Sequence, residues 1–110
     1  MTETELKSTN KYGSIRTYSN LCQREFASKL EARRAEELAL LERAGEISDL
    51  QYQVKFTLSK QPRVTITIDF AYVENRQQVY QDTKGVLTRD FRTKLAWLKQ
   101  LHGVDVNLTK

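Results

Sequence analysis

The stretch Val64–Lys84, "VTITIDFAYVENRQQVYQDTK", decides the fold that we expect for this chain. Apolar and polar residues alternate through 64–73, and this period of two is typical of a β-strand. The polar connection "ENRQ" leads into a further strand over 78–84, so the two strands can pair as a hairpin. Asp69 and Asp82 place acidic side chains on these strands, and the immediate neighbours of Asp69 are apolar.

Helical and extended patterns lie on both sides of this stretch. Residues 26–44 carry apolar residues at helical spacing among strong helix formers, and Gly45 is suited to end that helix. Alternation predicts a strand over 52–58 and a short last strand over 104–108, with a second helix over 89–102 between the hairpin and the last strand. The order helix, three strands, helix, strand predicts an α/β fold with a mixed four-stranded sheet.

Length and composition indicate one globular domain with a basic arm. The 110 residues carry 18 Lys and Arg against 14 Asp and Glu, and the charge of +4 favours an anionic partner such as nucleic acid. Residues 1–24 are polar without a sustained period, so we expect a loosely ordered basic arm before a domain over 25–110. The single cysteine, Cys22, excludes a disulfide framework within one copy and suits a reducing cytoplasm. No apolar segment has the length of a spanning helix or the form of a signal peptide, which predicts a cytoplasmic protein without a membrane partner.

The spacing of Asp82 and Lys84 suits phosphodiester hydrolysis. Side chains two apart on a strand share a face and lie about 6.6 Å apart. An acid in this position can hold Mg²⁺ while the lysine contacts the phosphate or the attacking water. Asp69 lies on the neighbouring strand of the hairpin, where two carboxylates repel each other unless a cation lies between them.

These residues also have structural interpretations that the sequence leaves open. Asp82 and Lys84 can form a solvated surface pair, as in many exposed hairpins. Asp69 can cap a strand end or pair with Arg63 or Arg76.

In its element order and in the places of its acids, the chain resembles the PD-(D/E)XK nuclease superfamily. The segments "FASKLEARRAEELALLERAGEI", "QVKFTL", "IDFAYV", "VYQDTKG" and "TRDFRTKLAWLK" together look like small phage and prophage proteins assigned to it, of a Holliday-junction-resolvase-like kind. The resemblance runs from Lys11 to Leu108 and implies an αβββαβ restriction-endonuclease-like core. It further implies that Asp69 and Asp82 bind Mg²⁺, for which Mn²⁺ can substitute. Lys84 would orient water or stabilise charge, and Glu31 on the first helix would support the metal.

Two positions depart from the pattern of that superfamily, and Glu31 has a second interpretation. Ile68 stands where a proline commonly precedes the first acid, and Asp82 replaces the commoner glutamate, which would hold the metal closer to its strand. Glu31 follows Ser28 at the spacing of a capping box, so it can instead serve the helix start or pair with Arg34.

Several basic and polar residues are candidates for DNA contacts. On the second helix, three basic residues form a stripe beside the apolar face and a fourth lies off it, and such a stripe can follow a phosphate backbone or be simply solvated. Thr88 can cap this helix or contact a phosphate. Gln53 on the first strand can touch the site or be an exposed strand residue. Lys11 belongs to the basic arm. These candidates are Arg89, Arg92, Lys99 and Lys94 on the helix, then Thr88, Gln53 and Lys11.

The resulting hypothesis is a phage-encoded, Mg²⁺-dependent DNA endonuclease in the bacterial host cytoplasm. One short chain offers little surface for reading bases, so selectivity for a DNA structure such as a junction is expected. A homodimer would present two sites to two strands, although the sequence does not require one. Two other classes stay open: a non-catalytic nucleic-acid- or partner-binding module on the same fold, and a subunit that is active only in a larger phage complex.

Overall fold

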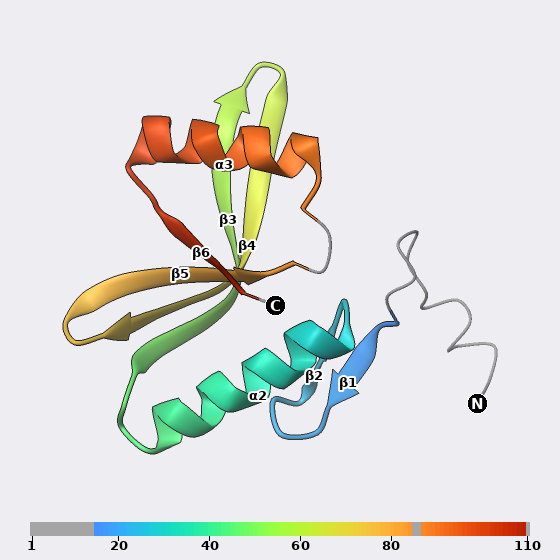
Figure 1. Ribbon diagram of the computed structural model, residues 1–110, viewed down its shortest axis with the longest axis vertical. Coiled ribbons are helices and arrows are strands. Elements are labelled where there is room, and N and C mark those ends of the chain that lie inside the picture. Colours follow the sequence, from blue (N-terminus) through green and yellow to red (C-terminus); the bar gives the residue numbers. More distant parts are fainter. Residues whose placement is uncertain (1–14, 85–86, 110) are drawn as a thin grey trace.

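The computed structural model describes residues 15–84 and 87–109, which form a mixed α/β fold (Figure 1). The elements follow one another as β1 (Thr17–Ser19), β2 (Arg24–Phe26), α2 (Lys29–Arg43), β3 (Ser48–Lys60), β4 (Arg63–Glu74), β5 (Gln77–Thr83), α3 (Arg89–His102) and β6 (Val106–Thr109). In the four-stranded sheet the order is β3-β4-β5-β6, with antiparallel pairs up to β5 and a parallel pair between β5 and β6. The predicted fold class and the order helix, three strands, helix, strand are confirmed.

The ends of both helices are set by residues that sequence analysis identified. Ser28 Oγ accepts the backbone N–H three residues later at 3.1 Å, and Thr88 Oγ1 does the same for α3 at 3.2 Å. Gly45 and Gly103 follow the helices at φ of 83° and 70°, in the left-handed region that glycine enters without a steric penalty. Neither helix of the described residues has the length and apolar character needed to cross a membrane.

The predicted hairpin is formed by β4 and β5. Asn75 and Arg76 connect the strands at φ of 53° and 64°, as in a two-residue turn whose twist matches that of the sheet. Phe70 pairs with Gln81, and Glu74 pairs with Gln77 next to the turn. This register determines which acidic side chains meet across the two strands.

A short antiparallel ribbon of β1 and β2 was missed by the sequence prediction. It pairs Thr17 with Phe26, and Ser19, a residue only 2% exposed, donates its hydroxyl to Glu36 Oε2 of α2 at 2.6 Å. The expectation of a loosely ordered arm is therefore wrong for the segment from residue 15 to residue 24, while residues 1–14 lie outside the described residues. Three-residue strands show no period in the sequence, and contact with α2 is what orders them.

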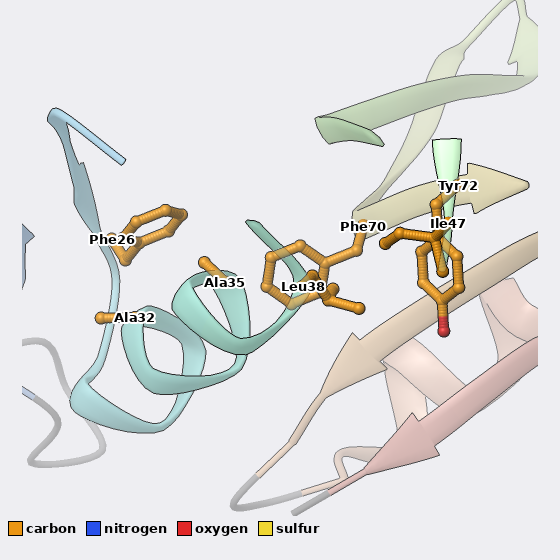
Figure 2. Close-up of a cluster of buried hydrophobic side chains, with 7 residues drawn as sticks. All are labelled: Phe26, Ala32, Ala35, Leu38, Ile47, Phe70 and Tyr72. Atoms are coloured by element: carbon orange, nitrogen blue, oxygen red, sulfur yellow. The ribbon is translucent and has the colours of Figure 1, made fainter. Parts of the chain in front are cut away.

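Two apolar cores lie on either side of the middle of β4. The first packs α2 against β2 and the sheet, and its side chains run from Phe26 at one end to Ile47 and Tyr72 at the other (Figure 2). The second packs α3 against the closed end of the β3–β4 hairpin (Figure 1). Phe70 belongs to the first core and Ile68 to the second, so Asp69 lies where the two cores meet.

Replacement of Leu38 by alanine should destabilise the fold strongly. This side chain is 0% exposed in the first core, so its loss leaves a cavity and should lower the free energy of unfolding by about 2–5 kcal/mol. Leu40→Ala on the same helix is the control, because Leu40 is 53% exposed and its loss should change stability by less than about 0.5 kcal/mol. Urea unfolding followed by circular dichroism measures both, and equal midpoints for the two variants would contradict the packing described above.

Candidate carboxylate site

A row of candidate site residues crosses the sheet at the junction of the two cores. The pairs Tyr52–Phe70 and Val54–Ile68 place Gln53 of β3 opposite Asp69 of β4. One residue beyond the pair Phe70–Gln81, the same register places Asp69 opposite Asp82 of β5. The two aspartates proposed as metal ligands therefore come from adjacent strands at the same level of the sheet.

Crossed hydrogen bonds hold the two aspartates in place. The Asp69 backbone N–H donates to Asp82 Oδ1 at 2.8 Å, and the backbone N–H and hydroxyl of Thr83 donate to Asp69 Oδ2 at 2.9 and 3.0 Å. Asp82 is 0% exposed and Asp69 is 8% exposed. Neither carboxylate is a surface residue, and no ion pair joins Asp69 to Arg63 or Arg76 among the described residues. The interpretation of Asp82 and Lys84 as a solvated pair is wrong for the buried acid.

Glu31 on α2 reaches this pair of aspartates from the helix side. It is 4% exposed, and Gln53 Nε2 donates to its Oε2 at 2.7 Å. The N-cap Ser28 accepts the backbone N–H of Glu31, and the carboxyl group of Glu31 interacts both with the backbone of Ala27 at the helix start and with Asp69 of the site. Arg34 pairs with Glu37 at 2.9 Å, so the alternative pairing of Arg34 with Glu31 is not formed.

The electrostatics of the site favour added positive charge. Burial, together with the nearby carboxylates of Asp69 and Asp82, raises the pKa of Glu31 from 4.5 to about 7. Burial and Asp69 also raise the pKa of Asp82, from 3.8 to about 6, although Lys84 acts in the opposite direction. Both pKa values lie near neutral pH, so a small change in pH there changes the protonation of Glu31 and Asp82.

Lys84 stands at the border between the buried acids and solvent. Its Nζ lies 3.0 Å from Asp82 Oδ2 and 4.2 Å from the centre of the Phe91 ring on α3, and its side chain is 30% exposed. The aromatic face stabilises the ammonium group by a cation–π interaction. The second core thus positions the lysine through Phe91, while the first core positions Glu31 through α2.

The donor atoms of the site fit a hard divalent cation. All three acids offer carboxylate oxygens, which Mg²⁺ and Mn²⁺ prefer. Asp82 Oδ2 is buried and has no hydrogen bond of good geometry within the described part of the chain, even though Lys84 Nζ is close. Over residues 15–84 and 87–109, no three Asp, Glu, His or Cys side chains are arranged to hold a metal in this conformation. Metal binding would therefore require side-chain rotation that brings the oxygens of Asp69, Asp82 and Glu31 to one point.

The basic candidates on α3 lie outside this cluster. Lys94 pairs with Asp90 at 3.7 Å and Lys99 with Asp105 at 2.6 Å, so two of the four basic candidates on this helix are engaged in local ion pairs. The two arginines of the stripe are exposed and form no ion pair with any described residue; they are Arg89 and Arg92. A role of this helix in DNA binding stays a prediction.

The remaining candidates have clear local roles or lie outside the described residues. Thr88 caps α3, and Gln53 holds Glu31, as described above. Lys11 belongs to the segment that the structure does not describe. Sequence analysis missed Thr83 and Phe91, because a threonine inside a strand and a phenylalanine on an apolar helix face carry no sign of the contacts they make.

Comparisons with known proteins identify one family. A family model with the description "Protein of unknown function (DUF1064)" matches residues 9–109 of the chain. No curated protein and no solved structure matches the chain significantly. The match covers the ribbon, both helices and the whole sheet, so the site lies within it.

Glu31→Gln should change how stability depends on pH. Because the pKa of Glu31 is higher in the folded chain than in the unfolded chain, the folded state binds more protons between about pH 4 and pH 7. Without divalent cations, this group therefore makes the wild type less stable as pH rises through that window. The variant lacks this loss, so its stability relative to the wild type should rise by about 1–3 kcal/mol from pH 5 to pH 8.

Urea unfolding at several pH values in a chelating buffer measures this difference. Glu74→Gln, which replaces an exposed carboxylate at the end of β4, is the matched control and should leave the wild-type pH dependence in place. Parallel curves for Glu31→Gln and the wild type would show that Glu31 is not coupled to buried acids.

Proposed function

The chain belongs to the DUF1064 family, and we propose that it is a metal-dependent endonuclease that hydrolyses phosphodiester bonds of DNA. The observation that carries the proposal is the meeting of Asp69, Asp82 and Glu31 inside the fold, with Lys84 as the cation at its edge. Substrate, reaction and metal are all part of the proposal.

The burial of these acids is difficult to explain by stability alone. Each ionised carboxylate that leaves water loses hydration, and like charges repel in the protein interior. One partly exposed lysine cannot neutralise three carboxylates, and burial together with the neighbouring acids raises the pKa values of Glu31 and Asp82. A divalent cation would offset the repulsion, which is why an arrangement of this kind is expected at a metal site.

Each residue of the cluster has a distinct part in the proposed reaction. Asp69, Asp82 and Glu31 would hold Mg²⁺, or Mn²⁺ in its place, and the ion would supply a lowered pKa for water and neutralise phosphate charge. Lys84 would direct its ammonium group toward the phosphate and stabilise the charge that develops there. Gln53 would position the Glu31 carboxylate that it already binds.

The element order supports a place in the PD-(D/E)XK nuclease superfamily as part of this proposal. An acid on β4, an acid and a lysine two apart on β5, and an acid on α2 match its pattern, while Ile68 and Asp82 depart from it. The proposal has three further parts that follow from this placement. The protein is phage-encoded and acts in the bacterial host cytoplasm, and it is selective for a DNA structure such as a junction. It assembles with a second copy or with a larger phage complex.

A non-catalytic binding module on the same fold is the second candidate. It is favoured by the crossed hydrogen bonds of Asp69 and Asp82, which use carboxylate oxygens that a metal would otherwise take. Such a module would bind nucleic acid or a protein partner without turnover.

Lys84→Ala should abolish DNA cleavage while leaving the fold intact. Loss of a charge-stabilising group at the phosphate should lower the rate at least about 10²-fold. Supercoiled plasmid and a four-way junction are incubated with protein and Mg²⁺ or Mn²⁺, with a chelator control, and products are separated on gels. Lys55→Ala, which removes an exposed lysine of β3, is the matched control and should cleave like the wild type.

The same assay decides between the two candidate functions. Asp82→Asn should also lose cleavage, because it removes a charge that the metal needs while keeping the shape of the side chain. Binding of DNA by the wild type without cleavage in either metal would reject the endonuclease and favour the binding module.

A further inference from the structure

We propose that the pocket between α2 and the end of β6 binds a backbone phosphate next to the phosphodiester at the carboxylate site. This inference rests on the proposed function and adds to it a second contact with the DNA strand. The pocket, called the α2–β6 pocket below, is lined by Leu30, Arg33, Arg34, Glu37 and Thr109. Figure 1 shows the end of β6 beside the first half of α2.

The two arginines of the α2–β6 pocket differ in how they are engaged. Arg34 is held in place, because its Nε donates to Gln81 Oε1 at 2.6 Å and its Nη1 to Glu37 Oε1 at 2.9 Å. Arg33 is exposed and has no hydrogen bond or ion pair with any residue in 15–84 or 87–109. A guanidinium group that is free at the rim of a pocket can form paired hydrogen bonds with a phosphate.

A third polar group of the pocket has no partner within residues 15–84 and 87–109. Thr109 Oγ1 is buried and has no hydrogen bond within the described residues. Buried hydroxyl groups are normally hydrogen-bonded, so an unpaired one in a pocket wall indicates a missing ligand or water. The two arginines and Glu37 together leave the pocket with a net positive charge, which fits an anion. Interactions among the described residues account for the position of Arg34 but for neither the guanidinium group of Arg33 nor the hydroxyl group of Thr109.

The α2–β6 pocket adjoins the carboxylate site on both of its walls. On the strand side, Thr109 pairs with Thr83, the residue that donates to Asp69, and the Thr109 carbonyl accepts the Lys84 N–H at 3.0 Å. On the helix side, Leu30 directly precedes Glu31. Phosphates follow one another regularly along a DNA strand. A strand with one phosphate at Lys84 can therefore place a neighbouring phosphate in the pocket.

Fluorescence anisotropy with labelled four-way junction DNA and duplex DNA tests the proposal without relying on cleavage. Measurements in Ca²⁺ and in chelator report binding by the intact chain. Arg33→Ala should weaken binding about tenfold and reduce the salt slope on duplex DNA by about 0.9, the value for one lost phosphate contact. Arg33→Lys should lie between this variant and the wild type, because lysine keeps the charge but not the paired hydrogen bonds.

Arg43→Ala is the matched control, since it removes an exposed arginine from the last turn of the same helix. It should retain most of the wild-type affinity and salt slope. Equal affinities and slopes for Arg33→Ala and Arg43→Ala would overturn the pocket proposal, even if the protein cleaves DNA. A selective effect of Arg33→Ala in a protein that never cleaves would support the pocket and reject the endonuclease. A wild type that binds no DNA would overturn both.

DNA with single neutral methylphosphonate linkages identifies the phosphate in question. At one linkage, neutralisation should weaken binding by the wild type and have no further effect on Arg33→Ala. If no linkage shows this dependence on Arg33, the residue contributes only diffuse charge and the pocket proposal is wrong.

Discussion

The crossed hydrogen bonds between β4 and β5 are the interaction on which the candidate site depends. Where the two strands end their regular pairing, Asp82 accepts the backbone N–H of Asp69, and Asp69 accepts both donors of Thr83. Charged groups are tolerated inside a protein only when donors or cations surround them. These bonds satisfy part of each carboxylate and leave Asp82 Oδ2 without a hydrogen bond in the described part of the chain. Hydrogen bonds thus hold the backbone of the site in place, while the negative charges of its carboxylates are only partly compensated.

The two apolar cores explain how a chain of 110 residues can position groups from four elements. The core around Leu38 fixes α2 against the sheet and so determines where Glu31 points. The core around Leu98 fixes α3, whose Phe91 ring lies under the Lys84 ammonium group. The two cores meet at Asp69. Packing in the first core orients the Glu31 carboxylate, and packing in the second core orients the Lys84 ammonium group.

Charge distribution separates the site from the rest of the surface. The ion pairs of Lys94 and Lys99 on α3 are local and exposed, and pairs of this kind contribute little to stability. In the buried cluster, by contrast, burial and the neighbouring acids raise the pKa of Glu31 to about 7 and that of Asp82 to about 6. If the proposed metal binds, protons and divalent cations would compete for these carboxylate oxygens.

The sequence by itself determined the helices, the hairpin and the meeting of Asp69 with Asp82. Ser28, Thr88 and the two glycines mark helix ends through bonds to neighbouring backbone, and a two-residue turn sets the register of β4 and β5. These features depend on residues close together in the chain, so a local pattern is enough to reveal them. The tertiary structure alone decided the β1–β2 ribbon, the bond from Gln53 to Glu31, the place of Phe91 under Lys84 and the α2–β6 pocket. Each joins elements whose relative position follows from how the two cores pack, and the period of a strand or helix does not encode that packing.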